Sequence, residues 1–333
     1  MLRVTELIRQ HAVLPYSFLP MPEAPKPWKS IDEQMDLLGR RGMSFHDGEL
    51  ARNFLERVGY YRLSGYFYPF RKTDDRGSRT DDFLEGSRFE DVVAMYVFDR
   101  KLRLLTMDAI ERIELAVQVD IAYQLGRSDP FAHHNPALVH RNALRKYRRR
   151  NGRPTSRYQE WITRYEELVS RSGKEACVRH NLEKYGRLPI WAAIQIWDFG
   201  SMSKFFAMMR HQDQGVIAGK YGIEAKHLQS WLRSLNFIRN VTAHHGRLWN
   251  CAIIERAKLP RNPVELRALD GSRPFLYFCL MKHLLDVISP GASWGERFIA
   301  HVDSFPAPAN AAVSLRDMGV PEKTVWKQWP LWA

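Results

Sequence analysis

The chain has 333 residues, of which 45% are hydrophobic and 26% are charged. This balance is typical of one large folded domain or two ordinary ones and excludes wholesale disorder. Fifty Lys and Arg residues face 37 Asp and Glu residues, and the formal net charge of +13 favours a polyanionic partner such as nucleic acid over an inert basic surface.

The three cysteines, Cys177, Cys251 and Cys279, lie far apart and have no CxxC spacing. This pattern argues against a disulfide framework and a cysteine-rich zinc site, and we expect reduced thiols. The apolar stretch 14–22 is too short and proline-rich for a signal-peptide core, and no apolar run is long enough to cross a membrane. We therefore expect a cytoplasmic protein with no membrane contact, no metal and no cofactor.

Two helices are the first predicted elements. Residues 20–30 are proline-rich and should be extended. Ser30 and Glu33 have the spacing of a capping box, which predicts a helix that starts here and stops near Gly42. A second helix is expected over residues 47–59, because its apolar residues recur at helical spacing.

An aromatic segment follows at residues 59–70, GYYRLSGYFYPF, with six aromatics in twelve residues. Such a segment can be a stacking surface for bases or a packed seam between helices, and we favour the seam because aromatics mostly fill cores. The polar residues 72–82 predict a loop and mark a candidate boundary of the N-terminal region, residues 1–82.

A long helix is predicted over residues 89–125, where apolar residues keep helical spacing for many turns. Its length favours a helical bundle over a sheet protein. Further helical patterns cover residues 158–185, 188–210, 224–245 and 272–290. The tail after residue 305 is rich in proline and tryptophan and is expected to wrap the surface. The predicted fold class is all-α, with a helical domain at 83–300 and a C-terminal tail at 301–333.

A basic insert interrupts the helices at about residues 126–157. Within it, residues 141–157 carry eight Lys or Arg residues and no acid. A solvated basic loop would have this composition, but a phosphate-tracking arm is favoured because such a dense positive run repels itself without a counter-charge. The candidate RNA-binding residues in this insert are Arg145, Lys146, Arg148, Arg149, Arg150 and Arg153.

The motif that could carry chemistry is RNVTAHHGRLWN, residues 239–250. Arg239 and His244 are five positions apart, about 140° around an ideal helix, so their side chains diverge. They could still converge on a ligand at the helix end, or meet the same pair of a second copy in a symmetric dimer.

These residue types suit RNA cleavage without a metal, because the neighbouring 2′-hydroxyl is an internal nucleophile. His244 could transfer the proton, and Arg239 could stabilise the charged transition state. Asn240 could hold either of them, while His245 and Arg247 could contact flanking phosphates. Spacing alone is weak evidence, because Arg41 and His46 have the same separation, and polar packing at a helix end explains it equally well.

Four segments in the same order resemble the AbiD/AbiF-like abortive-infection proteins of the HEPN superfamily, over about residues 26–290. They are QMDLLGRRGM with GYYRLSGYFYPF, FDRKLRLLTMDAIERIE, LPIWAAIQIWDFGSMS and RNVTAHHGRLWN.

The resemblance implies a HEPN-type helical bundle and a metal-independent endoribonuclease whose active site is completed by homodimerisation. It also implies anti-phage defence, with RNA as substrate and a structured small RNA as a possible partner. Carried over to this chain, it makes Arg239 and His244 the catalytic pair and Asn240 the polar residue after the arginine. Thr242 stands where many relatives have cysteine.

Two points stay open: the role of two glutamates near the motif, and the function itself. Glu111 and Glu114 could orient Arg239 across the bundle, although a plain salt bridge on the helix surface is favoured. The chain could also be a non-catalytic RNA-binding defence protein that uses the Arg–His motif to hold RNA or a dimer contact. A DNA-binding regulator is the weakest alternative, since no helix-turn-helix pattern supports it.

Overall fold

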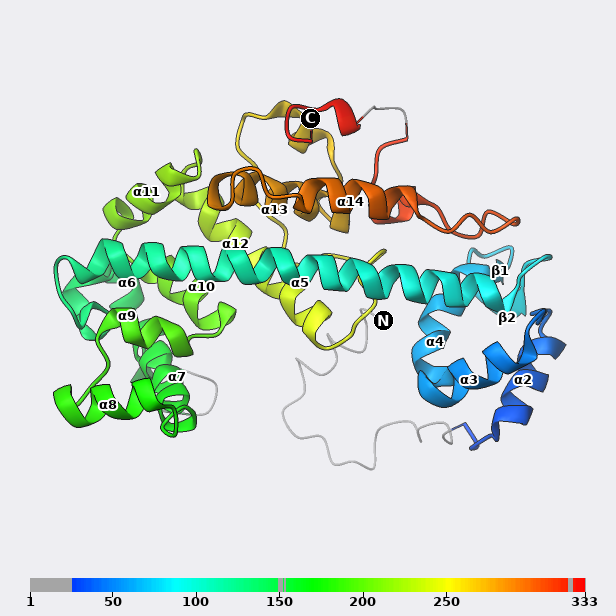
Figure 1. Cartoon of the computed structure of the whole chain (residues 1–333), viewed down its shortest axis with the longest axis horizontal. Coiled ribbons are helices and arrows are strands. Elements are labelled where there is room, and N and C mark those ends of the chain that lie inside the picture. The colour runs from blue at the N-terminus through cyan, green and yellow to red at the C-terminus, as the bar shows by residue number, and fades with distance from the viewer. Residues whose placement is uncertain (1–25, 149–151, 153, 323–325, 333) are drawn as a thin grey trace.

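A computed structural model describes residues 26–148, 152, 154–322 and 326–332. The molecule is an elongated, mainly helical body, and the helices pack around one long central helix, α5 (Figure 1). The predicted helical fold class is confirmed, with two small antiparallel strand pairs added to it.

Helix α5 covers Phe89–Gly126, close to the predicted 89–125. It reaches this length because no proline or glycine interrupts the sequence before Gly126. One face is buried along the whole length, and it packs on α4 near one end, on α10–α13 towards the other, and on α14. The helix therefore connects the N-terminal region to the rest of the core.

The N-terminal region contains α2 (Ile31–Arg40), α3 (Gly48–Arg57), α4 (Tyr60–Phe67) and the short 3₁₀ helix η2 (Tyr68–Phe70). The predicted capping box is confirmed. The backbone N–H of Glu33 donates to Ser30 Oγ at 3.2 Å, and that of Ser30 donates to Glu33 Oε2 at 2.6 Å.

The predicted loop at 72–82 is wrong, because β1 (Arg71–Thr73) and β2 (Arg79–Phe83) form an antiparallel hairpin. The turn is closed by Asp74, whose Oδ1 accepts from the backbone N–H groups of Arg76 and Ser78. Most of the strand residues are solvent-exposed, so the sequence has no alternating apolar pattern to reveal them.

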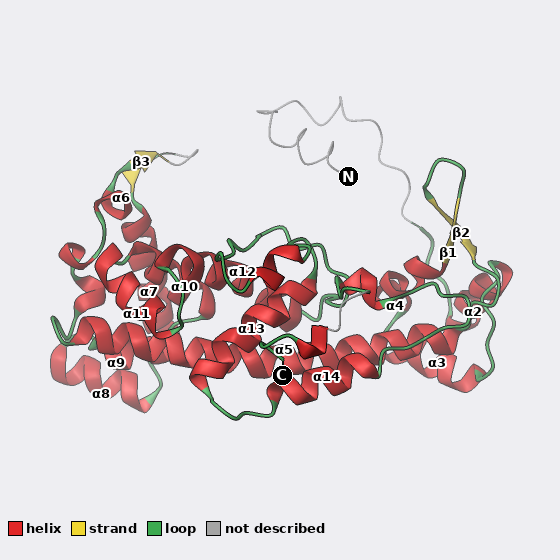
Figure 2. Cartoon of the chain, turned by 90° about the horizontal axis from the view of Figure 1, so that it is seen from above, coloured by secondary structure: helices red, strands yellow, loops and turns green. Residues whose placement is uncertain are grey.

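The basic insert contains short elements at the far end of α5. These are η3 (Ala132–His134), η4 (Pro136–Leu138), α6 (Arg141–Leu144) and the strand pair β3 (Tyr147–Arg148) and β4 (Pro154–Thr155). The β3–β4 hairpin and the β1–β2 hairpin project from the same side of the body (Figure 2).

The predicted helical stretch 158–185 is confirmed as α7 (Arg157–Arg171) and α8 (Ala176–Tyr185). The stretch 188–210 becomes α9 (Ile190–Ala193), η5 (Ile194–Ile196) and α10 (Phe199–Met208). The last two predicted helices are α12 (Ala225–Ala243) and α13 (Pro274–Ile288). In this half of the chain the sequence analysis also did not predict α11 (His211–Lys220), η6 (Val264–Ala268) or α14 (Trp294–Asp303).

The C-terminal tail contains η7 (Leu315–Met318) and η8 (Trp326–Gln328). Its side chains enter the core, since Trp326 and Trp332 are buried against Phe275 and Phe298. The proposed boundaries at 82/83 and 300/301 fall inside β2 and α14. In the described part of the chain, no helix is both long enough and apolar enough to span a membrane.

Candidate functional site

The candidate site lies at the C-terminal end of α12. The predicted buried face of this helix is confirmed, since Leu228, Trp231, Leu232, Leu235 and Ile238 are all buried. Arg239 follows and is half-buried, whereas Asn240, His244 and His245 are exposed. The helix thus presents its last turn to solvent while the preceding turns hold it in the core.

The end of α12 is a left-handed cap centred on His245. The N–H of Gly246 donates to the carbonyl of Val241 at 2.7 Å, and the N–H of His245 donates to that of Thr242 at 3.0 Å. His245 has φ +57°, a conformation that favours glycine, and His244 is the last residue before it. Gly246 has no room for a side chain, since a Cβ there would lie 3.0 Å from the carbonyl oxygen of Val241.

Replacing His245 by glycine is expected to raise the free energy of unfolding by about 1 kcal/mol, because glycine adopts positive φ without the steric cost that a Cβ brings. His245→Val should lower it by about 1–2 kcal/mol, because a β-branched residue is strained further there. Urea denaturation of the three proteins measures both changes. Equal stability of all three would show that position 245 carries no strain.

A buried polar cluster holds the loop that follows the cap. Asp99 of α5 is fully buried and accepts from the backbone N–H of Trp249 at 2.8 Å and that of Leu248 at 3.1 Å. It also accepts from Tyr66 Oη and from Arg103 Nη1, both at 2.6 Å. Arg103 Nη1 in turn donates to the carbonyl of Gly246 at 3.2 Å. Asp99 and Arg103 thus restrain residues 246–249 directly, and Tyr66 bonds to Asp99.

Helix α4 makes two further contacts with this loop. Arg62 Nη1 donates to the carbonyl of His245 at 2.7 Å. Arg247 Nη1 donates to the carbonyl of Gly65, so part of the guanidinium predicted to contact a flanking phosphate is engaged with the protein. The N-terminal region is therefore bonded directly to the candidate catalytic loop.

The guanidinium of Arg239 has no carboxylate partner within salt-bridge distance among the described residues. Its Nη1 donates only a long hydrogen bond of 3.4 Å to Asn240 Oδ1, and its Nε is buried without a partner. Glu114 of α5 lies near enough for the Arg239 charge to lower its pKa, but burial has the larger effect, and Asp198 and Glu111 act in the same direction as burial. The pKa of Glu114 is raised to about 7 as a result. Among the described residues, Glu111 and Glu114 form no hydrogen bond to Arg239 that could orient it. They also form no surface salt bridge within the described part of the chain.

Glu114→Gln is expected to stabilise the protein above pH 7 and not below pH 4.5. The carboxyl is protonated in both states at low pH, whereas above its folded pKa of about 7 the half-buried group is charged and costs stability. After allowance for solvent screening, the gain at pH 8 is about 2 kcal/mol. Unfolding curves at pH 4.5 and pH 8 measure it, and an equal effect at both pH values would contradict the raised pKa.

The predicted residues of the basic insert lie apart from this cluster. Arg145, Lys146 and Arg148 are exposed at the α6–β3 end of the molecule, next to α7 (Figure 2). Arg149, Arg150 and Arg153 lie outside the described residues. The structure thus separates the predicted residues into a compact set at the end of α12 and a distant basic surface.

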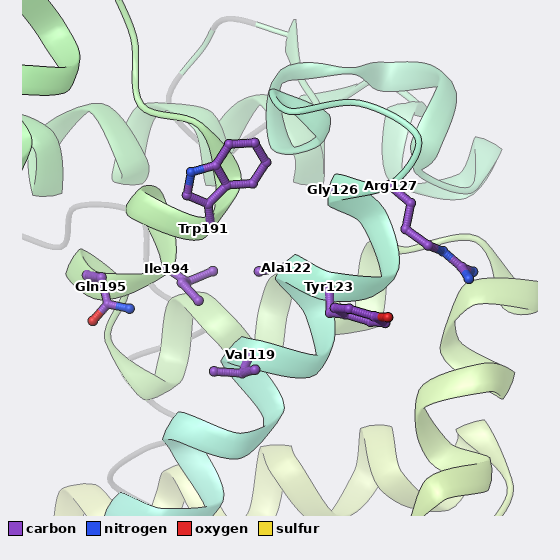
Figure 3. Close-up of a pocket in the computed structure, with 8 residues that line it drawn as sticks. All are labelled: Val119, Ala122, Tyr123, Gly126, Arg127, Trp191, Ile194 and Gln195. Atoms are coloured by element: carbon purple, nitrogen blue, oxygen red, sulfur yellow. The ribbon is translucent and has the colours of Figure 1, made fainter.

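A pocket of about 480 Å³ lies between α5 and α9, away from the candidate site. Ile194 points toward Val119 and Ala122, and Arg127 is the one charged lining residue of the pocket (Figure 3). Because it lacks an acid–base pair, the pocket does not compete with the end of α12 as a site for catalysis. The described residues contain no group of three His, Cys, Asp or Glu side chains placed to hold a metal ion.

Comparison with known proteins agrees with part of the resemblance. No curated protein and no solved structure matches the chain. The family model described as "Abi-like protein" matches residues 53–250, a shorter span than the expected 26–290. The match includes α4, α5 and the whole of RNVTAHHGRLWN, and ends at Asn250. Since it covers more than half of the 333 residues, the chain belongs to the Abi-like protein family.

Proposed function

We propose that this protein is a metal-independent endoribonuclease of abortive-infection defence, with its active site completed by a second copy of the chain. Membership of the Abi-like family points to abortive infection. The nuclease proposal rests on two side chains at the end of α12. His244 is exposed, and Arg239 forms no ion pair with a described carboxylate.

In the proposed reaction the 2′-hydroxyl of the substrate attacks the adjacent phosphorus atom and the bond to the 5′-oxygen breaks. His244 accepts the 2′-hydroxyl proton, a role that suits imidazole at neutral pH, and water donates a proton to the leaving 5′-oxygen. Arg239 stabilises the negative charge on the phosphoryl oxygens, and Asn240 holds its guanidinium. The products are a 2′,3′-cyclic phosphate and a 5′-hydroxyl.

A symmetric dimer would bring the Arg239 and His244 of different copies together. Within one chain Arg239 and His244 diverge, and His244 occupies the helix cap while Arg239 turns partly into the core. Two copies related by a two-fold axis would place the Arg239 of each copy opposite the His244 of the other, so that the dimer holds two equivalent sites.

The test is to incubate the purified protein with total RNA in the presence of a chelator and to map the new ends. Cyclic-phosphate ends that disappear in His244→Ala, with RNA binding unchanged, support the proposal. Cleavage that is equal in wild type and His244→Ala would refute the role of His244.

A second candidate is a non-catalytic RNA-binding defence protein, favoured by the exposed basic surface at Arg145, Lys146 and Arg148. This candidate predicts RNA binding without any cleavage that depends on His244 or Arg239. The same digestion experiment therefore separates the two.

Replacing Arg145, Lys146 and Arg148 together by alanine is expected to weaken RNA binding and to lower the salt slope of the affinity by about 2, because each lost phosphate contact removes about 0.7 for a single strand. Fluorescence anisotropy across a salt titration measures both. The matched control replaces three exposed cations of α7, α8 and the turn between them, Arg171, Lys174 and Arg179. If both triple variants behave alike, the insert has no specific phosphate role.

A further inference from the structure

One face of α4, continued into η2, carries two solvent-exposed tyrosines beside the candidate site. Tyr61 is 92% exposed and Tyr68 is 50% exposed. They are seven residues apart, which places them on the same side of the helix about two turns from each other. The other aromatics of this segment pack as the predicted seam: Tyr66, Phe67 and Phe70 are buried, and Tyr60 is half-buried.

Gly65 lies between the two tyrosines and has no side chain to separate them. Arg247 occupies that place, because a Cβ at Gly65 would lie 3.6 Å from Arg247 Nη1. Tyr61, Gly65 and Tyr68, with the guanidinium of Arg247 against Gly65, form a surface that we call the tyrosine strip.

The strip has two further cations at its borders. The guanidinium of Arg79, from β2, lies 6.0 Å from the centre of the Tyr68 ring and is held there by a hydrogen bond to the carbonyl of Arg71. Arg62 is exposed next to Tyr61. Among the described residues, Arg62, Arg79 and Arg247 form no ion pair with a carboxylate.

The acidic residues of the β1–β2 hairpin near the strip are engaged in part. Asp81 of β2 pairs with Arg41 and with Arg71, and Asp74 accepts the backbone N–H groups of its own turn, whereas Asp75 and Asp82 are exposed. The charged residues of the strip and its borders are arginines, which call for an anionic ligand.

Planar rings alternating with guanidinium groups match the chemistry of an unpaired nucleic acid. Exposed aromatic faces stack on bases, and guanidinium groups pair with the phosphates between them. A duplex does not offer this match, since its bases are already stacked and paired. An exposed tyrosine such as Tyr61, which has no packing role in the protein, fits a stacking platform.

We infer that the tyrosine strip binds an unpaired segment of RNA, with its bases on Tyr61 and Tyr68, and leads the strand to the His244 end of α12. The hydrogen bond of 2.7 Å from Arg62 to the carbonyl of His245 fixes the start of the strip against the candidate catalytic loop. The choice of RNA as the ligand rests on the proposed function, and the strip adds to that function a preference for single-stranded substrates.

Binding is tested on the full-length protein with a fluorescein-labelled 2′-O-methyl oligonucleotide of about twelve residues, which lacks the attacking hydroxyl and stays intact. Fluorescence anisotropy should show a loss of affinity of about tenfold for Tyr61→Ala and for Tyr68→Ala. Tyr61→Phe should retain binding, because phenylalanine keeps the stacking face.

The matched control is Tyr123→Ala. Tyr123 lies on α5, is 71% exposed and has Lys220 5.8 Å from its ring centre, so it resembles Tyr68 with Arg79 but lies off the strip. Salt titration gives a second readout: the slope should stay unchanged in Tyr61→Ala and fall by about 0.7 in Arg79→Ala, because only the arginine contacts phosphate.

The binding measurements test the strip independently of the nuclease activity. Cleavage of total RNA is measured in parallel. Selective loss of single-strand binding in the strip variants supports the strip, even if the wild type cleaves no RNA and the proposed function fails. Binding that is unchanged in Tyr61→Ala and Tyr68→Ala, or weakened equally by Tyr123→Ala, overturns the strip. So does an equal affinity of the wild type for a duplex of the same length.

Discussion

Replacing Asp99 by alanine is expected to lower the free energy of unfolding by about 3–5 kcal/mol, the largest stability effect that we predict in the described part of the chain. The carboxylate accepts two backbone N–H groups, the Tyr66 hydroxyl and the Arg103 guanidinium in a fully buried position. Its removal leaves a buried arginine without its counter-charge and two buried amides without acceptors.

Asp99→Ala should also destabilise the neighbouring loop more than the rest of the protein. Because Asp99 fixes the loop at 246–249, amide hydrogen exchange of Leu248 and Trp249 should accelerate in the variant before α12 itself opens. Urea denaturation gives the global value. Asp108→Ala is the matched control, since Asp108 is also on α5 and also pairs with arginines, Arg112 and Arg297, but near the surface. It should cost at most about 1 kcal/mol, and an equal loss in both variants would contradict the assigned role of Asp99.

The sequence predicted the helices because the signals that form a helix lie in neighbouring residues of the chain. The capping box at Ser30 and Glu33 and the uninterrupted apolar periodicity of α5 can be read from neighbouring residues, and both are confirmed. The β1–β2 hairpin was missed for the opposite reason. Most of its strand residues are exposed, with Phe83 the buried one, and the strands are held by backbone pairing and the Asp74 turn, which leave no apolar pattern.

The sequence predicted the residues of the candidate site but not the buried residues that hold its loop in place. Arg239, His244 and the end of the helix near Gly246 follow from the motif, whereas the anchor Asp99 contacts Trp249 from 150 positions away. Such long-range contacts are set by how the helices pack, and one sequence does not encode them visibly. For the same reason, the aromatic segment at 59–70 did not show which of its rings would be left in solvent.

Mixing two inactive variants is expected to restore RNA cleavage if the active site is shared between copies. Arg239→Ala and His244→Ala should each lose about a thousandfold or more in activity, because each removes an interaction used in the transition state. Both side chains are at or near the surface of α12, so the folded dimer should survive either change. If one site takes Arg239 from one chain and His244 from the other, a mixed dimer contains one intact site.

The expected recovery of activity follows from the fraction of mixed dimers and the number of intact sites in each. Random exchange of equal amounts makes about half of the dimers mixed, each with one intact site of two, so the mixture should reach about a quarter of the wild-type activity. If Arg239 and His244 act within one chain, the mixed dimer has no intact pair and the mixture stays as inactive as its parts. The measurement is the rate of cyclic-phosphate formation after denaturation and joint refolding, with separately refolded variants mixed only at the assay as the control. A mixture that stays inactive although mass spectrometry detects mixed dimers would refute the shared site, and full activity in a protein that remains monomeric would refute it more directly.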